Sequence, residues 1–146
     1  MLGYNYYRNQ VLIGSKNAST LARTAVTVTS AFADNLSRII STGGSSKIEL
    51  LLSYTAKENG NNIDVRVEWG FDGTNMYQLV NDSTSGATST LTQRVFTFDA
   101  ASSATAYELA IPLDASDKFV RIAIRESAVG VNYGTAFVEL LVTAAK

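Results

Sequence analysis

The stretch that decides the fold is IDVRVEW, at residues 63–69. Apolar side chains occupy every second position and charged side chains the positions between, which is the pattern of a β-strand with one core face and one face toward water. Residues 47–54 alternate in the same way, and the polar residues 58–62 favour a turn. We therefore expect these two strands to pair as a hairpin.

Further strand patterns extend along the chain in both directions. The turn residues 70–75 lead into a short apolar strand at 76–80, whereas the Ser, Thr, Gly and Asn residues of 81–90 predict an exposed loop. Residues 32–40 suit either a strand or a short helix. Five more strands are expected, at 25–30, 91–99, 106–113, 118–126 and 134–143.

About eight strands without strong helical periodicity predict an all-β protein, an antiparallel β-sandwich of jelly-roll type. The only proline, Pro112, falls within the expected strand 106–113. Because proline has no amide proton, it is restricted to an edge, an end or a bulge of a sheet. We expect the strand to end there.

The first 23 residues differ from the rest of the chain. They begin with apolar and aromatic residues without sustained alternation and continue as the polar segment 14–20. We expect an N-terminal arm at 1–23 and one β-sandwich domain at 24–146. A terminus becomes ordered only when something holds it, so the arm either packs on its own domain or reaches a partner. The arm residues expected at an interface are Tyr4, Tyr6, Tyr7, Val11, Leu12 and Ile13.

The last expected strand carries apolar residues on both of its faces. One face holds Val138, Leu140 and Val142, and the other holds Phe137, Glu139 and Leu141. Two apolar faces imply either a covered position or a contact with a neighbouring subunit. We therefore expect the second set to form an exposed face that is buried against another copy or a shell.

Composition excludes several classes of function. The 146 residues contain neither histidine nor cysteine, so they lack the groups that most often serve as bases near pH 7, reactive thiolates and zinc ligands. A formal net charge of −1 predicts no broad attraction to nucleic acids or anionic membranes. No apolar run approaches the roughly 20 residues of a membrane span, and the polar, tyrosine-rich start lacks the pattern of a signal peptide. We expect no nucleic-acid or membrane partner, no cofactor, and synthesis in the cytoplasm.

A few clusters of side chains suggest chemistry. Trp69, Phe71 and Tyr77 flank a turn and are residue types on which sugar rings stack, but alternation assigns Trp69 to the core. Phe71 and Tyr77 remain as a candidate glycan platform. Residues 72–75 lack the ligand spacing of a calcium loop and predict a plain turn.

Acidic residues elsewhere have a structural interpretation. Asp114 and Asp117 flank Ser116 in a polar turn, where carboxylates are normally solvated, so we expect neither catalytic residues nor a metal site. The outward residues of 63–69, which are Asp64, Arg66 and Glu68, suit cross-strand ion pairs or a polar subunit interface.

Three stretches together carry a resemblance: VRVEWGFDGTN at 65–75, LAIP at 109–112 and KFVRIAIR at 118–125. They resemble the β-sandwich accessory proteins of tailed-bacteriophage virions, in which a strand, an aspartate-glycine turn and a second strand precede a late strand with an arginine and a terminal apolar strand. The resemblance covers about residues 46–143. It implies a capsid decoration or cement protein, a homotrimer on the virion surface whose partner is the major capsid protein, without enzymatic residues.

Similar stretches occur in carbohydrate-binding jelly rolls and in phage tail and baseplate modules. The alternative is therefore a carbohydrate- or receptor-binding module of a phage tail or an enzyme. It would use Phe71, Tyr77 and the segments 70–75 and 81–90.

Overall fold

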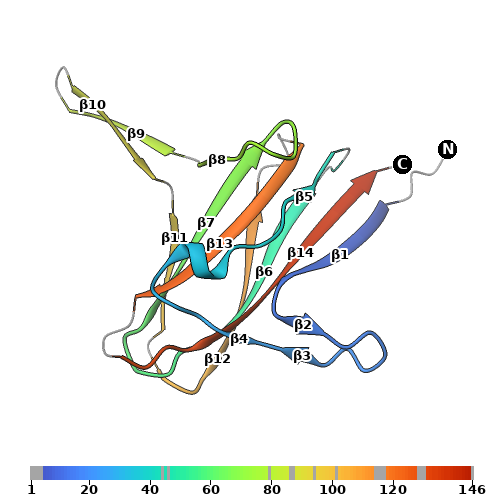
Figure 1. Cartoon of the computed structure of the whole chain (residues 1–146), viewed down its shortest axis with the longest axis vertical. Coiled ribbons are helices and arrows are strands. Elements are labelled where there is room, and N and C mark those ends of the chain that lie inside the picture. Colours follow the sequence, from blue (N-terminus) through green and yellow to red (C-terminus); the bar gives the residue numbers. More distant parts are fainter. Residues whose placement is uncertain are drawn as a thin grey trace.

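The structure is a computed structural model that describes residues 5–43, 45, 47–78, 80–85, 88–93, 95–100, 102–113, 118–127 and 131–145. For residues 5–8, 81–85, 88–93 and 144–145 only the backbone is described. Two antiparallel sheets pack face to face (Figure 1). The protein is therefore all-β and consistent with the β-sandwich that the alternating strands predict. The jelly-roll connectivity stays a prediction.

The first sheet has the strand order β1-β14-β6-β12, and the two-residue strand β4 pairs with the start of β14. All of its pairings are antiparallel. Its strands are β1 (Asn5–Ile13), β4 (Val26–Thr27), β6 (Lys47–Thr55), β12 (Ala106–Leu113) and β14 (Thr135–Ala145).

The second sheet has the order β11-β7-β13-β5, and β8 pairs with the end of β7. Its strands are β5 (Ile40–Ser41), β7 (Asn62–Gly70), β8 (Tyr77–Gln78), β11 (Val95–Asp99) and β13 (Phe119–Ser127). Outside the two sheets lie two hairpins and one turn of 3-10 helix: β2 (Ser15–Lys16) with β3 (Arg23–Thr24), β9 (Val80–Ser85) with β10 (Thr88–Gln93), and η1 (Phe32–Asn35).

The core lies between the two sheets and is made of every second residue of the long strands. Because facing sheets are about 10 Å apart, aliphatic side chains from both inner faces fill the space between them. Trp69 continues the inward series of β7 and is buried, as predicted. The fully buried aliphatic residues include Ile48, Leu50 and Leu52 on β6, Ile63, Val65 and Val67 on β7, and Ile122 and Ile124 on β13.

The expected hairpin of residues 47–54 and 63–69 is wrong. β6 pairs with β12 and β14, whereas β7 pairs with β11, β13 and β8, so the two strands belong to different sheets. Each strand has one apolar face, and placing the strands in facing sheets buries both faces against each other. The connecting residues cross from one sheet to the other, with Gly60 at φ +83°, a backbone conformation that glycine adopts without strain.

Residues 81–85 and 88–90, expected within a loop at 81–90, lie in the β9–β10 hairpin instead. Serine and threonine suit a solvated pleated strand, so a polar composition does not exclude strand structure. The expected strand at 25–30 is reduced to β4. Residues 32–40 combine both expectations, since η1 is followed by an isolated bridge from Leu36 to Ala123 and by β5.

Pro112 lies inside β12, which continues to Leu113 rather than ending at the proline. β12 is the edge strand of its sheet, where a missing amide proton is tolerated. In the part of the chain that the structure describes, no helix has the length and apolar character to cross a membrane.

Candidate interaction surfaces

The expected arm packs on its own domain from Asn5 onward. β1 pairs with β14 along most of its length, and the chain then turns at Gly14 into the β2–β3 hairpin. Gly14 has φ +90°, and a Cβ there would overlap the Thr24 carbonyl oxygen and the Phe137 ring. The turn therefore requires glycine both for its backbone conformation and for the close approach of the ring.

The arm residues expected at an interface have different surroundings. Ile13 is buried in the core of its own chain and Leu12 packs against that core, while Val11 is partly buried. The backbones of Tyr6 and Tyr7 lie opposite Ala144 and Thr143 in the β1–β14 ladder. Tyr4 lies outside the described residues. Of this set, Ile13 offers no surface to a partner.

The outer face of β14 is covered by the β2–β3 hairpin of the same chain. Phe137 and Glu139 are each 2% exposed. Lys16 Nζ lies 2.8 Å from Glu139 Oε1 and Arg23 Nη2 lies 3.5 Å from Oε2, and the Arg23 guanidinium is 5.4 Å from the centroid of the Phe137 ring. The expectation of an exposed face is therefore wrong for Phe137 and Glu139, and the alternative of a covered position holds. Leu141 is partly exposed, and its role at an interface stays a prediction.

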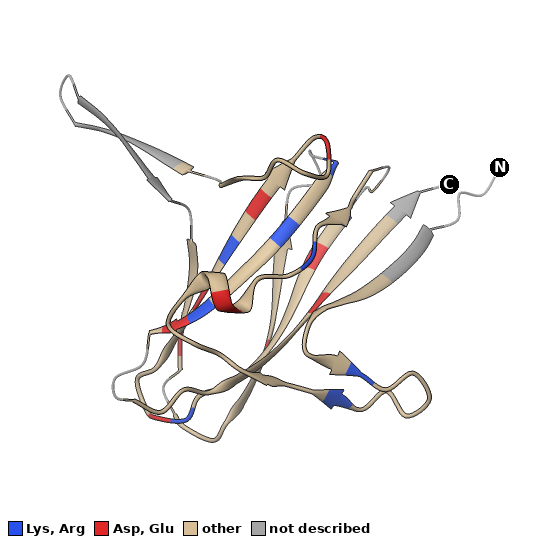
Figure 2. Ribbon diagram, in the orientation of Figure 1, with Lys and Arg blue, Asp and Glu red and all other residues tan. Residues whose placement is uncertain are grey.

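The outward face of the second sheet carries a ladder of ion pairs. Glu68 lies 3.1 Å from Arg66 on its own strand and 2.5 Å from Arg121 across the sheet, and Asp64 lies 2.8 Å from Arg125. Figure 2 shows residues of both signs side by side on β7 and β13. The cross-strand ion pairs expected from residues 63–69 are confirmed.

η1 lies over part of this face, while the Arg125 side chain stays 44% exposed. Two guanidinium groups lie over the Phe32 ring, with the Cζ atoms of Arg66 and Arg125 at 4.6 and 4.5 Å from its centroid. Asp64 and Glu68 are consequently buried. The cation–π contacts of Phe32 hold η1 on the sheet, and the ion pairs join β7 to β13 beneath it. In the sequence, the only signal for this cover is the apolar Phe32 in an ambiguous segment.

A fully buried carboxylate lies at the end of β13. Glu126 Oε1 accepts hydrogen bonds from the Tyr54 hydroxyl at 2.8 Å and Asn61 Nδ2 at 2.5 Å, and Oε2 accepts from the Gly134 backbone N–H at 2.5 Å. These three donors are neutral groups. Burial, and then the hydrogen bond and charge of Glu126, raise the pKa of Tyr54 well above its ordinary value. The network joins the two sheets and the segment before β14.

This perturbation predicts a specific loss of stability in alkali. A tyrosine whose pKa is raised in the folded state stabilises the fold below the unfolded value of about 10, and the stability falls as the pH rises above it. Above pH 10 the wild type should lose up to about 1.4 kcal/mol per pH unit from Tyr54 alone. Urea unfolding at a series of pH values measures this slope. Tyr54→Phe should remove it, whereas Tyr77→Phe, at an exposed site, should leave it unchanged; equal slopes in all three proteins would contradict the prediction.

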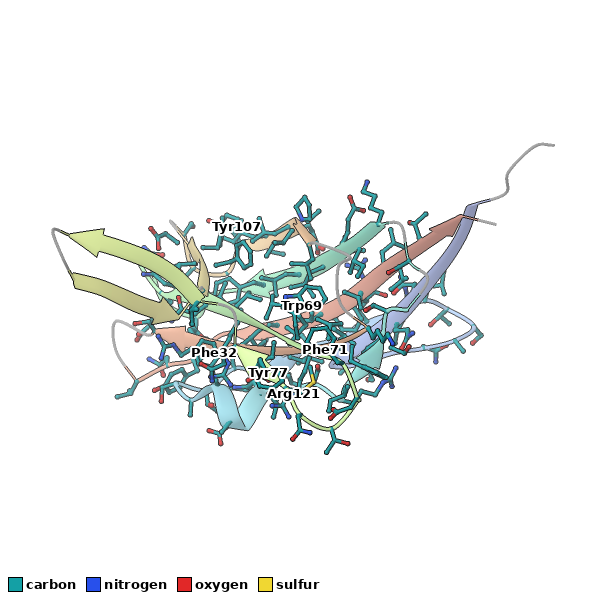
Figure 3. All side chains as sticks on the ribbon, turned by 90° about the horizontal axis from the view of Figure 1, so that it is seen from above. Phe32, Trp69, Phe71, Tyr77, Tyr107 and Arg121 are labelled. Atoms are coloured by element: carbon teal, nitrogen blue, oxygen red, sulfur yellow. The ribbon has the colours of Figure 1, made fainter. Side chains whose placement is uncertain are left out.

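The turn after β7 presents two exposed aromatic side chains. Phe71 is 67% and Tyr77 is 63% exposed, whereas Trp69 lies in the core beside Tyr77 in the β7–β8 pairing. Figure 3 shows both close to Trp69, on the side of the molecule that carries Arg121. The two residues of the candidate glycan platform are thus available to solvent.

The same turn is braced by Asp72. Its carboxylate accepts hydrogen bonds from the backbone N–H of Asn75 at 2.8 Å and of Thr74 at 2.9 Å, and from Asn75 Nδ2 at 2.7 Å. The backbone donors of Asn75 and Thr74 lower the pKa of Asp72 to about 2. This is the plain turn that the sequence predicts, with Gly73 at φ +74°. Among the described residues, no group of three or more acidic side chains is arranged to hold a metal ion.

The β9–β10 hairpin departs from the edge of the second sheet. β8 and β11 lie along the same edge of β7, and the chain leaves that edge after β8 and returns at β11. In Figure 1 the hairpin extends beyond the sandwich. Among the described strands, β9 and β10 pair only with each other.

An apolar groove of about 350 Å³ runs between the edge strands β11 and β12. It is lined by Phe96 and Phe98 from one sheet and by Leu109 and Ile111 from the other. Its few polar lining groups include Glu108, which already binds Arg23 and Ser53. The groove is the open side of the sandwich rather than a site with convergent polar groups.

Asp114 and Asp117, considered and set aside as an acid/base pair, lie outside the described residues. The described acids that are buried, namely Asp64, Glu68, Glu126 and Glu139, all have hydrogen-bonding or ionic partners within the fold. Comparison with models of known protein families and with curated proteins finds no match to this chain.

Proposed function

We propose that this chain is a structural virion protein, a capsid decoration or cement protein that binds the assembled shell of a tailed phage. Its partners are further copies of itself, as a homotrimer, and the major capsid protein. The observation that carries the proposal is the β9–β10 hairpin, whose strands pair with neither sheet among the described residues. An isolated two-stranded hairpin is marginally stable in water, so a projecting one is best explained by a partner that holds it.

The chemistry of the body supports an assembly role without catalysis. Its buried carboxylates are bound to donors within the fold, and the chain has no histidine or cysteine that would titrate or oxidise under ordinary conditions. A tile of this kind keeps the same contacts across a wide range of conditions. We therefore propose that the protein acts by binding its partners on the virion surface rather than by catalysing a reaction.

The proposal is tested by sedimentation with purified shells of the virus that encodes the chain. Because a decoration protein binds only the assembled state, it should sediment with shells, leave unassembled capsid subunits unbound, and raise the temperature at which the shells come apart. A heat-unfolded sample controls for trapping. Failure to sediment with shells at micromolar concentrations would overturn the proposal.

A second candidate, a carbohydrate- or receptor-binding module, is favoured by the exposure of Phe71 and Tyr77 on one braced turn. Phe71→Ala and Tyr77→Ala should each weaken binding to a captured glycan by about fivefold, since an aromatic contact contributes roughly 1 kcal/mol. Glycan-array binding followed by titration measures the effect. Val131→Ala, at another exposed apolar residue, is the matched control. Absence of any bound glycan, or equal binding by all variants, would remove this candidate.

A further inference from the structure

The β9–β10 hairpin is an insertion into what would otherwise be one continuous edge strand. Gln78 lies opposite Glu68, and Val95 lies opposite Arg66. Moving two residues along β7, from 68 to 66, moves 17 residues along its partner, from 78 to 95, so 15 residues are extra. Removing residues 80–94 would leave position 79 opposite Val67 and would join β8 to β11 in unbroken register.

The side-chain pattern agrees with this register. Directly opposed residues of an antiparallel pair share a face of the sheet. Tyr77 shares a face with Trp69, and Phe96 shares one with Val65, so a leucine at position 79 would fall on the inner face with Val67. We define residues 80–94 as the insert hairpin. The sandwich can close without it, so its presence needs a reason other than folding.

The composition of the insert hairpin indicates how it would bind. Only Val80, Ala87 and Leu91 are apolar, and only Asp82 and Arg94 are charged. Such a segment has little apolar area to bury and little charge to pair. Backbone hydrogen bonding to another strand edge is the recognition mode that suits it.

The chain itself offers one long edge for such pairing. β1 has nine residues, pairs with β14 on one side, and pairs on the other side with none of the described strands. Among the other described edge strands, β12 carries Pro112, which interrupts its amide donors, β11 has five residues, and β5 has only two. An unpaired edge strand is a template for a strand from another molecule.

We propose that the insert hairpin of one copy pairs with the outer edge of β1 in a second copy. In Figures 1 and 3 the hairpin and β1 lie on opposite sides of the body, so the contact joins two different surfaces. Repeated contacts between two different surfaces produce a closed ring when the rotation between copies allows closure. The inference rests on the proposed function, because it names the contact that forms the expected trimer.

The test is the solution mass of the full chain and of a variant lacking residues 80–94, measured by light scattering at about 100 µM. We expect the full chain to form a closed oligomer and the deletion variant to be a monomer with an unchanged β-type circular dichroism spectrum and cooperative unfolding. A monomeric full chain, or a deletion variant that keeps the oligomer, would overturn the inference.

A second measurement covers the case in which the deletion variant fails to fold. Since the chain has no cysteine, Asn9→Cys and Thr90→Cys introduce the only thiols. The double variant treated with a short bismaleimide should give covalent oligomers on a denaturing gel, and each single variant should not. If the double variant is oligomeric in solution but the bismaleimide gives no covalent oligomer on the gel, the proposed contact is overturned.

The shell assay separates this inference from the proposed function. A monomer that binds shells overturns the β1 contact and leaves the decoration role standing. An oligomer held by the insert hairpin that ignores shells leaves the contact standing and overturns the decoration role.

Discussion

Glu126→Ala should lower the free energy of unfolding by about 3–5 kcal/mol, the usual penalty for removing one member of a buried polar network. The carboxylate is fully buried and accepts hydrogen bonds from Tyr54, Asn61 and Gly134. Alanine removes the acceptor of the Tyr54 hydroxyl and of the Gly134 N–H, leaves Asn61 Nδ2 with the Asn132 carbonyl oxygen, and leaves a cavity in place of the removed atoms. Urea unfolding followed by tryptophan fluorescence measures the loss, since Trp69 lies in the same core.

Two further variants separate the network from general effects of the substitution. Glu126→Gln keeps one acceptor oxygen but turns an amide N–H₂ toward a donor, so its loss should fall between those of the wild type and the alanine variant. Glu108→Ala is the matched control, because Glu108 is 62% exposed and its bond to Arg23 is solvated. The control should cost less than about 1 kcal/mol. A similar small loss for Glu126→Ala would show that the network does not hold the fold.

The inward direction of Glu126 could have been predicted from the alternation of inward and outward residues along its strand. It has the same parity as Val120, Ile122 and Ile124, and β13 is regular through Ser127, so the strand directs Glu126 inward like its apolar neighbours. Because Glu126 is charged, the alternation of apolar residues alone does not assign it to the core. A carboxylate that continues an inward series is a signal for a buried network that must find its donors elsewhere in the chain.

The alternation of apolar and polar residues predicted the bounds of individual strands better than it predicted which strands pair. The bounds of β6, β7, β12 and β13 agree with the expected segments to within a residue or two, because alternation is a property of the strand itself. The pairing of β6 with β7 was wrong because a polar connection between two strands serves equally well as a hairpin turn and as a crossing between sheets. That choice depends on which faces meet in the core.

The insert hairpin illustrates a different limit. Its Ser- and Thr-rich composition predicts an exposed segment at residues 81–90, but composition does not distinguish a solvated hairpin from a loop. Only the register on both sides, at Gln78 and Val95, reveals that the segment interrupts one edge strand. Likewise, the exposure of Phe71 and Tyr77 follows from the turn, which the sequence did predict.

Lys16→Met should destabilise the fold by about 2–3 kcal/mol, although lysine is normally an unimportant surface residue. Its partner Glu139 is almost fully buried on β14, and among the described residues its remaining ionic partner without Lys16 is Arg23, at 3.5 Å. A charge that stays buried after losing its nearest partner is costly. Thermal unfolding and urea unfolding measure the loss, and Lys47→Met, in an exposed pair with Glu49, should change stability by less than about 1 kcal/mol.

A substitution of the partner residue Glu139 should lower the free energy of unfolding less than Lys16→Met does. This difference tests where the N-terminal segment lies. Glu139→Gln removes the buried charge, and Lys16 and Arg23 can then turn toward water, since their side chains are 23% and 43% exposed. If the β2–β3 hairpin covers β14 in solution, Lys16→Met should lower the free energy of unfolding more than Glu139→Gln does. The double variant should lose less than the sum of the two single losses, because it no longer buries an uncompensated charge. Equal and additive losses would mean that Glu139 is solvated and that the hairpin does not lie on β14. Phe137 and Glu139 would then be available to a second copy after all, as the two-faced pattern of the last strand allows.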